Sequence, residues 1–232
     1  MVGRQLILDV GLHETFSFDN FVIGANKLVV DQLQQLIKNP AKEFSYLIYG
    51  ASGCGKTHLV GAVMEQFQKL GRTCTYYPLE DWAELSSKAL SEDIYSDLIC
   101  LDGLSEVLGN LEWECAIFDC YNNRQINKKP MLITMRESPK LSRFWLSDLK
   151  SRLLAGLIFK LSAMNDEDRL LCLQSRAQER GMNLPASVAR FLLERRSRNN
   201  RALLEALDQL DRASIEEHRV LTIPFVKQIL EI

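Results

Sequence analysis

Eight consecutive residues constrain this chain most, because they form a complete phosphate-binding loop of the pattern Gly-x-x-x-x-Gly-Lys-Ser/Thr. The loop consists of Gly50, Ala51, Ser52, Gly53, Cys54, Gly55, Lys56 and Thr57. An apolar run at residues 46–49 precedes it and a helical pattern at residues 57–70 follows, which gives the strand, turn and helix start that such a loop needs. A glycine-rich turn before an ordinary helix is the alternative. The full match in this context predicts a nucleotide site.

The residues of the loop have different tasks in holding a phosphate. Gly50, Gly53 and Gly55 allow backbone N–H groups to curl around an anion, and the helix N-terminus adds partial positive charge. The Lys56 ammonium is expected to reach the β- and γ-phosphates, and the Thr57 hydroxyl to ligate Mg²⁺. The sequence therefore predicts a nucleotide bound together with magnesium.

Asp102 is the second part of the expected site. It ends an apolar, strand-like run at residues 98–101, and an aspartate there is the expected water-mediated Mg²⁺ partner of Thr57. An aspartate that caps a loop is the alternative. Gly103 follows, where hydrolytic relatives usually carry an acid that orients water, so slow hydrolysis by the chain alone is expected. Glu106 is a substitute base one turn later, although a solvated surface glutamate is the simpler interpretation.

Alternating short apolar runs and helical patterns predict an α/β fold with a parallel five-stranded sheet. The expected strands are residues 46–49, 73–77, 98–101, 131–134 and 157–161, with helices such as 113–125 between them. After residue 161 only helical patterns follow, at 165–180, 185–195, 201–215 and about 222–230, which predicts a small all-helical lid. The expected division is an N-terminal segment at 1–17, a nucleotide-binding subdomain at 18–162 and the lid at 163–232.

Charge and cysteine usage limit the classes of partner and compartment. The chain has 28 Lys and Arg against 30 Asp and Glu, a net charge of −2, which argues against a broad nucleic-acid or membrane surface. Its 6 cysteines have no C-x-x-C spacing and no set of histidine partners for a metal site, as expected for reduced thiols. No apolar stretch has the length of a signal peptide or membrane span, so a cytoplasmic protein is expected.

Three more polar residues occupy useful positions along the predicted sheet and lid. Thr134 ends the fourth expected strand and is a candidate for contact with the γ-phosphate or the attacking water. Arg152 precedes the fifth strand, and Arg201 begins the third lid helix, where it is a candidate to fold over the phosphates. Strand-end threonines and surface arginines are common, and only their order relative to the phosphate loop distinguishes these three.

That order resembles the AAA+ ATPases, and more closely the bacterial DnaA family. Residues 18–24 resemble the segment that leads into the family's core, 50–59 its phosphate loop, 132–134 its sensor 1, 149–152 its arginine-finger box and 199–204 its sensor 2. The resemblance covers residues 5–232 and implies the AAA+ fold. It also implies nucleotide contacts from residues outside the loop motif, namely Phe21, Val22, Ile23, His58 and Arg201.

Within this family the resemblance is closest to Hda-type regulators. The initiator carries a helix-turn-helix domain beyond its lid, whereas this chain ends with the lid, and residues 111–119, 207–214 and 221–227 look like Hda. Such regulators begin with a sliding-clamp motif, which residues 5–10 resemble. An extended peptide can insert apolar side chains into a groove while a glutamine bonds the rim. The residues concerned are Gln5, Leu6, Leu8 and Val10; an N-terminal strand or frayed segment is the alternative.

The resemblance implies a negative regulator of chromosomal replication initiation. Such a protein holds ADP and Mg²⁺, is tethered to the DNA polymerase III sliding clamp, and inserts Arg152 into the initiator DnaA to stimulate its ATP hydrolysis. DNA would be met only through the clamp, no membrane is involved, and weak homo-oligomers are expected. The alternatives are a helicase-loader-type ATPase acting on the replicative helicase and a structural module that holds a nucleotide. Near-neutral charge argues against an autonomous DNA-binding initiator.

Overall fold

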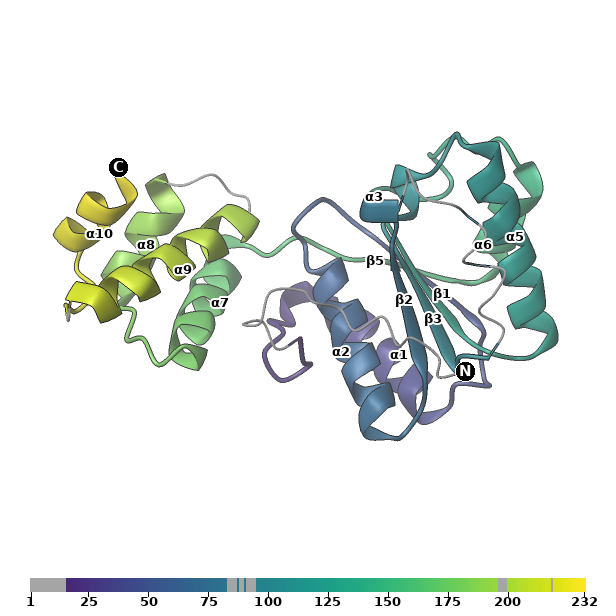
Figure 1. The fold of residues 1–232 in the computed structure, drawn as a ribbon, viewed down its shortest axis with the longest axis horizontal. Coiled ribbons are helices and arrows are strands. Elements are labelled where there is room, and N and C mark those ends of the chain that lie inside the picture. Colours follow the sequence, from purple (N-terminus) through teal and green to yellow (C-terminus); the bar gives the residue numbers. More distant parts are fainter. Residues whose placement is uncertain (1–15, 83–86, 88–89, 91–94, 196–199, 218) are drawn as a thin grey trace. The chain divides into compact units, whose positions relative to one another are not determined.

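The computed structural model describes residues 16–82, 87, 90, 95–195, 200–217 and 219–232 (Figure 1). The predicted clamp-binding residues Gln5, Leu6, Leu8 and Val10 lie outside the described part. The chain forms two compact units. The sheet unit contains residues 16–18, Leu28–Ala51 and Gly55–Leu161, and the helical unit contains Asp19–Lys27, Ser52–Cys54 and Ser162–Ile232. The last change of unit falls between Leu161 and Ser162, and two earlier segments group with the lid.

The sheet unit is built on five parallel strands, as the sequence predicted. They are β1 (Ser45–Tyr49), β2 (Cys74–Pro78), β3 (Leu98–Asp102), β4 (Met131–Met135) and β5 (Leu157–Lys160). Their order across the sheet is β2-β3-β4-β1-β5, and every neighbouring pair is parallel. The central strands β3 and β4 are buried along their whole length, because helices cover both faces of a sheet of this kind.

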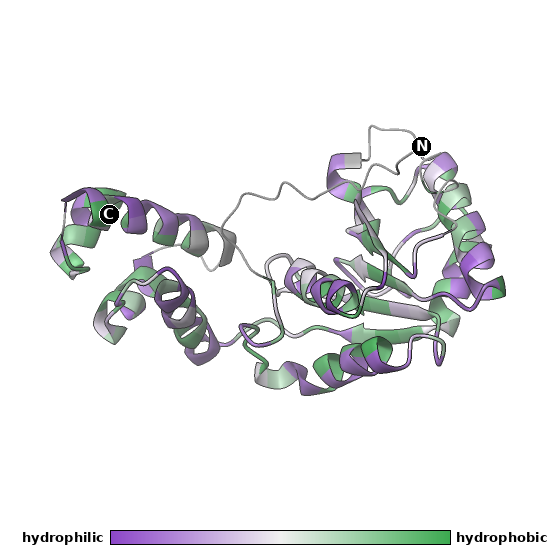
Figure 2. Ribbon diagram, turned by 60° about the horizontal axis from the view of Figure 1, so that its bottom comes forward, coloured by the Kyte–Doolittle hydropathy of each residue, from purple (hydrophilic) through white to green (hydrophobic). Residues whose placement is uncertain are grey.

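Helices lie on both faces of this sheet in Figure 1, with α1 (Lys27–Lys38) and α2 (Lys56–Lys69) on one and α5 (Leu111–Ile126) and α6 (Ser147–Ala155) on the other. The short elements are η1 (Gly24–Asn26), α3 (Leu79–Trp82) and η2 (Leu104–Glu106). Hydrophobic colouring follows the strands in Figure 2, and hydrophilic residues interrupt it along the helices. Trp113, Ile117 and Tyr121 of α5 pack in one buried cluster with residues of β1, β3 and β4.

Helices α1 and α6 of this unit were not predicted from the sequence, and neither was the short α3. In α1 the buried residues recur at helical spacing, and they are Val29, Val30, Leu33, Leu36 and Ile37. In α6 the buried pair Leu149 and Leu153 is four residues apart. The helical spacing of apolar residues was therefore present in α1. Helix α6 has only nine residues, of which two are buried leucines, and this is too few to show a helical period.

The helical unit contains α7 (Asp166–Glu179), α8 (Ala186–Arg195), α9 (Asn200–Glu217) and α10 (Ile223–Leu230), which confirms the predicted lid. Leu173, Leu192, Leu207 and Phe225 bring the four helices into one apolar core. Gly181 has φ +75°, a left-handed conformation that glycine adopts readily just after a helix end. Thr222 caps α10 through its side chain, which accepts a hydrogen bond from the Phe225 amide.

The cap of α7 gives a testable contribution to lid stability. The Asn165 side chain accepts a hydrogen bond of 2.7 Å from the Asp168 amide, which satisfies one otherwise unpaired donor of the first turn. Asn165→Ala should lower the free energy of unfolding by about 1 kcal/mol, measured by denaturant titration. Asn165→Ser keeps a capping oxygen and should lose much less. Equal losses in the two variants would show that the cap contributes nothing.

Candidate nucleotide-binding site

The phosphate loop leaves β1 at the carboxyl edge of the sheet and runs directly into α2. Gly53 and Gly55 have φ values of +75° and +101°, in the left-handed region that favours glycine. Gly55 is the N-cap of α2 and supplies no side-chain acceptor to the first turn of this 14-residue helix. The amide groups of that turn, together with the helix dipole, would favour an anion at the end of the loop.

Lys56 is held against the loop that it follows. Its ammonium donates hydrogen bonds of 2.7 Å to the Gly50 carbonyl and 2.9 Å to the Ala51 carbonyl. These contacts keep the positive charge beside the loop backbone, where phosphate oxygens would lie. The contact of Lys56 with phosphates remains a prediction.

The Asp102 carboxylate is the centre of a hydroxyl network at the same edge of the sheet. The Thr57 hydroxyl donates to Oδ2 at 2.7 Å, and the Tyr76 hydroxyl donates to the same oxygen at 3.0 Å. The Thr134 hydroxyl donates to Oδ1. Asp102 is only 9% exposed. The structure thus brings Thr57, Asp102 and Thr134 together from α2, β3 and β4.

The oxygen groups of this network fit a hydrated magnesium ion. A hydroxyl has one proton and two lone pairs, so Thr57 can donate to Asp102 and still offer an oxygen lone pair to a metal. Mg²⁺ is usually held by one or two protein oxygens, substrate phosphates and water. Thr57 and Asp102 would hold it, and the ion would neutralise phosphate charge. No cluster of three His, Cys, Asp or Glu side chains suited to another metal occurs among the described residues.

Thr134 is fully buried, and both functions of its hydroxyl are occupied. It donates its proton to Asp102 and accepts a 2.9 Å hydrogen bond from the Gly103 amide. Contact between this proton and a γ-phosphate would therefore require the hydroxyl to turn away from Asp102. In this arrangement Thr134 connects the Asp102 carboxylate to the backbone of the turn that begins at Gly103.

Tyr76 is the residue of this network that sequence reasoning missed. Burial and the nearby Asp102 carboxylate raise the pKa of its phenol, so the hydroxyl is protonated and available as a donor near neutral pH. In the register of β2 with β3, Pro78 lies opposite Asp102 and Tyr76 opposite Cys100. A tyrosine in an apolar strand carries no sequence signal for such a contact, because only the strand pairing brings it near the carboxylate.

Glu106 differs from the solvated surface glutamate that the sequence suggested. Its carboxylate forms an ion pair of 2.7 Å with Arg136, which follows β4. The Arg136 amide also bonds the Ser105 hydroxyl at 3.0 Å. Gly103 makes this turn with φ +87°. The acidic group nearest in sequence to Asp102 is therefore engaged by a cation across the edge of the sheet.

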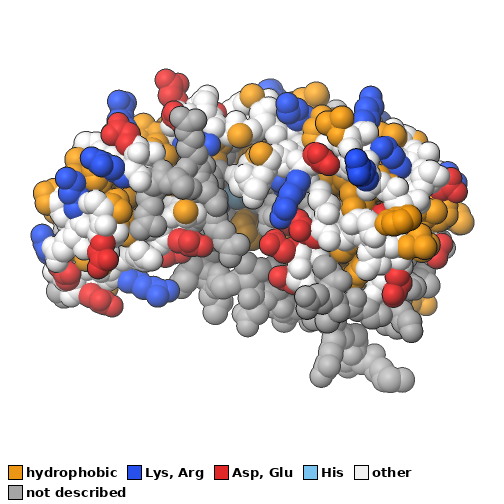
Figure 3. Space-filling model, turned by 90° about the horizontal axis from the view of Figure 1, so that it is seen from above, with side chains coloured by type: hydrophobic (Ala, Val, Ile, Leu, Met, Phe, Trp, Pro, Cys, Tyr) orange, Lys and Arg blue, Asp and Glu red, His pale blue; other side chains and the backbone are white. Residues whose placement is uncertain are grey.

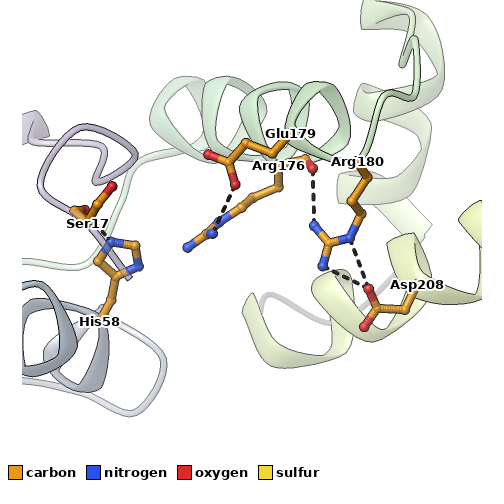
Figure 4. A network of polar contacts seen from close by, with 6 residues as sticks. All are labelled: Ser17, His58, Arg176, Glu179, Arg180 and Asp208. Carbon is orange, nitrogen blue, oxygen red and sulfur yellow. Dashed lines mark hydrogen bonds and ion pairs between the residues drawn. The ribbon is translucent and has the colours of Figure 1, made fainter. Parts of the chain in front are cut away.

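His58 has local partners in the sheet unit (Figure 4). Its Nε2 atom lies 2.8 Å from the Ser17 carbonyl oxygen, and its ring meets the Phe16 ring edge-on at 5.4 Å between centroids. These contacts attach residues 16–17 to α2. They account for His58 without a nucleotide, and its predicted nucleotide contact remains a prediction.

The other predicted site residues lie in different parts of the two units. Arg152 is exposed on α6, and its carbonyl accepts a 2.8 Å hydrogen bond from the buried Tyr121. Arg201 belongs to α9. Phe21, Val22 and Ile23 form an irregular segment of the helical unit, with Ile23 42% exposed.

The described surface carries both signs of charge. On the face drawn in Figure 3, Lys and Arg side chains are interspersed with Asp and Glu side chains, and apolar groups lie between them. No helix in the described part of the chain is long and apolar enough to cross a membrane.

Comparison with known proteins identifies the family. Residues 12–160 match the model of the bacterial DnaA ATPase domain, and residues 166–230 match that of the Hda lid domain. The chain is a Hda/DnaA-family AAA+ protein. This is a family of replication-initiation regulators. An uncharacterized protein of Haemophilus influenzae is 38% identical over 232 residues, which is 100% of both chains.

Solved structures of DnaA share the fold. Domain III of the Thermotoga maritima replication initiation protein DnaA is 22% identical, with a TM-score of 0.82 over 95% of this chain and 97% of that one. The AMPPCP-bound DnaA of Aquifex aeolicus is 21% identical, with a TM-score of 0.74 over 89% of this chain and 68% of that one. Identities of this size establish the fold alone.

Proposed function

We propose that this chain is a nucleotide-bound regulator that stimulates ATP hydrolysis by the initiator DnaA while tethered to the DNA-loaded sliding clamp. In this proposal the phosphate loop holds ADP with Mg²⁺, residues 5–10 bind the clamp, and Arg152 enters the active site of DnaA. Family membership supports the class of partner. The AMPPCP bound to the Aquifex aeolicus relative supports the class of ligand.

The exposed position of Arg152 carries the proposal. Arg152 lies on α6, on the face of the sheet opposite α1 and α2 (Figure 1), whereas the chain's own phosphate loop leads into α2. Leu149 and Leu153 anchor the same helix in the core. A guanidinium presented outward from a rigid helix suits insertion into a neighbouring protein, where it would stabilise charge developing on a transferred phosphate.

The residues around Asp102 support a holding role for the bound nucleotide. No carboxylate follows Asp102 directly, since Gly103 is the next residue, and Glu106 is paired with Arg136. Water attack on a phosphate is helped by a group that orients the water. We therefore expect slow hydrolysis by the chain itself, and fast hydrolysis only in the partner.

A reconstitution with labelled ATP–DnaA tests this function. DnaA should hydrolyse its ATP faster when the ADP-loaded chain and a clamp on DNA are both present. Replacing Gln5 and Leu8 by alanine should abolish the clamp-dependent stimulation, because the glutamine that would bond the rim and one of the apolar side chains that would enter the groove are lost. The same reaction with clamp but without DNA is the control. Robust hydrolysis by the chain alone, with no effect on DnaA, would instead favour a helicase-loader-type ATPase.

A further inference from the structure

We propose that Tyr76 is a positioning residue that orients the Asp102 carboxylate, and through it Thr57, for magnesium-assisted nucleotide binding. The proposal rests on the nucleotide site proposed above and adds a residue that the phosphate-loop motif does not contain. It concerns the arrangement of the protein's own hydroxyl groups around one carboxylate.

Two hydroxyls converge on the same carboxylate oxygen. Asp102 Oδ2 accepts from Thr57 at 2.7 Å and from Tyr76 at 3.0 Å, while Oδ1 accepts from Thr134. An ionised carboxylate can accept about four hydrogen bonds, and protein hydroxyls supply three of them here. With donors on both oxygens, the plane of the carboxylate is fixed by three different elements, α2, β2 and β4.

The orientation of Asp102 determines which way Thr57 offers its oxygen. Because the Thr57 hydroxyl donates its proton to Oδ2, its lone pairs are directed away from Asp102 and stay available to a metal ion. If the Asp102 carboxylate could rotate, the Thr57 hydroxyl would lose this fixed acceptor and could turn its proton elsewhere. Tyr76 therefore acts on the metal site through Asp102 and Thr57, without touching the ligand.

The environment makes the Tyr76 contact effective. Tyr76 lies in β2, an edge strand whose pairing to β3 is fixed over five residues, from Cys74 to Pro78. Its hydroxyl reaches a carboxylate that is only 9% exposed, so little water is available to replace the lost donor. Hydrogen bonds to charged acceptors in such surroundings are stronger than those at the surface.

The experiment compares the binding of fluorescent ADP with saturating Mg²⁺ and in EDTA. Tyr76→Phe keeps the ring and removes only the donor, so the Kd with Mg²⁺ should rise about 2- to 10-fold while the Kd in EDTA stays unchanged. Tyr46→Phe, which changes another buried tyrosine of the same sheet, should leave both values unchanged. An unchanged Kd with Mg²⁺, or equal changes with and without it, would overturn the inference.

A double-mutant cycle separates positioning through Asp102 from a general effect on the sheet. In the Asp102→Asn background, Tyr76→Phe should have little further effect on the Mg²⁺-dependent Kd, because its acceptor has lost the charge. Additive losses would contradict the inference. If the wild-type chain binds no ADP at all, the proposed nucleotide site itself fails. ADP binding that does not depend on Mg²⁺ would instead leave the site standing and overturn the inference about Tyr76.

Discussion

Arg152→Ala should abolish stimulation of DnaA-bound ATP hydrolysis while leaving ADP binding by this chain intact. Arginine fingers are worth roughly 10³- to 10⁵-fold in rate, because the guanidinium meets charge that develops only in the transition state. Arg152 is exposed, and its neighbours Leu149 and Leu153 hold the helix in the core, so the substitution should not disturb the fold. The measurement is hydrolysis of labelled ATP on DnaA with the clamp-loaded DNA present.

Two matched variants sharpen this test. Arg152→Lys retains the charge but loses the planar donor pair, so it should recover only a small part of the stimulation. Arg190→Ala removes an exposed arginine from α8 of the helical unit and should leave stimulation unchanged. Normal stimulation by Arg152→Ala would contradict the proposed mechanism, whatever the fate of the nucleotide site.

Lys56→Ala should weaken nucleotide binding by about 10- to 100-fold or more. Its ammonium lies beside the loop carbonyls of Gly50 and Ala51, and hydrogen bonds between charged groups contribute about 1.5–3 kcal/mol each. Each 1.4 kcal/mol corresponds to a tenfold change in Kd. Titration with fluorescent ADP measures this loss directly, and ligand-dependent thermal stabilisation should fall with it.

Lys69→Ala is the control, because it removes a lysine from the other end of the same helix. Lys69 is exposed and pairs with Glu65 at 2.8 Å, an arrangement worth about 0.3–0.5 kcal/mol. Its removal should leave the Kd for ADP unchanged. If both variants bind ADP equally well, the phosphate loop does not bind phosphate in the predicted way.

Much of the fold could be predicted because its signals are local. Each expected strand overlaps an observed one, since runs such as residues 98–101 are apolar on both faces, as buried parallel strands require. The contacts of the caps Asn165 and Thr222 are equally local, because a capping side chain bonds an amide only a few residues away. Helix α6 was missed because its nine residues contain only two buried anchors.

The candidate site divides in the same way. The phosphate loop was visible because all its residues are consecutive, and Asp102 because it ends an unmistakable strand. The partners of Glu106 and His58 were not visible, since Arg136 and Ser17 are 30 and 41 positions away in the chain and become neighbours only on folding. The grouping of Asp19–Lys27 with the lid also depends on a distant contact, where the Asn26 amide bonds the Ser162 backbone at 2.8 and 3.1 Å.

The sequence by itself determined the fold class, the phosphate loop and the order of the strands and lid helices, because glycine conformations, helix caps and apolar runs act within a few residues. Only the tertiary structure decided what surrounds Asp102. Tyr76, Thr57 and Thr134 belong to three separate elements, and the parallel pairing of β2, β3 and β4 together with the packing of α2 brings their hydroxyls onto one carboxylate. Parallel register is set by long-range packing, which no short stretch of sequence records.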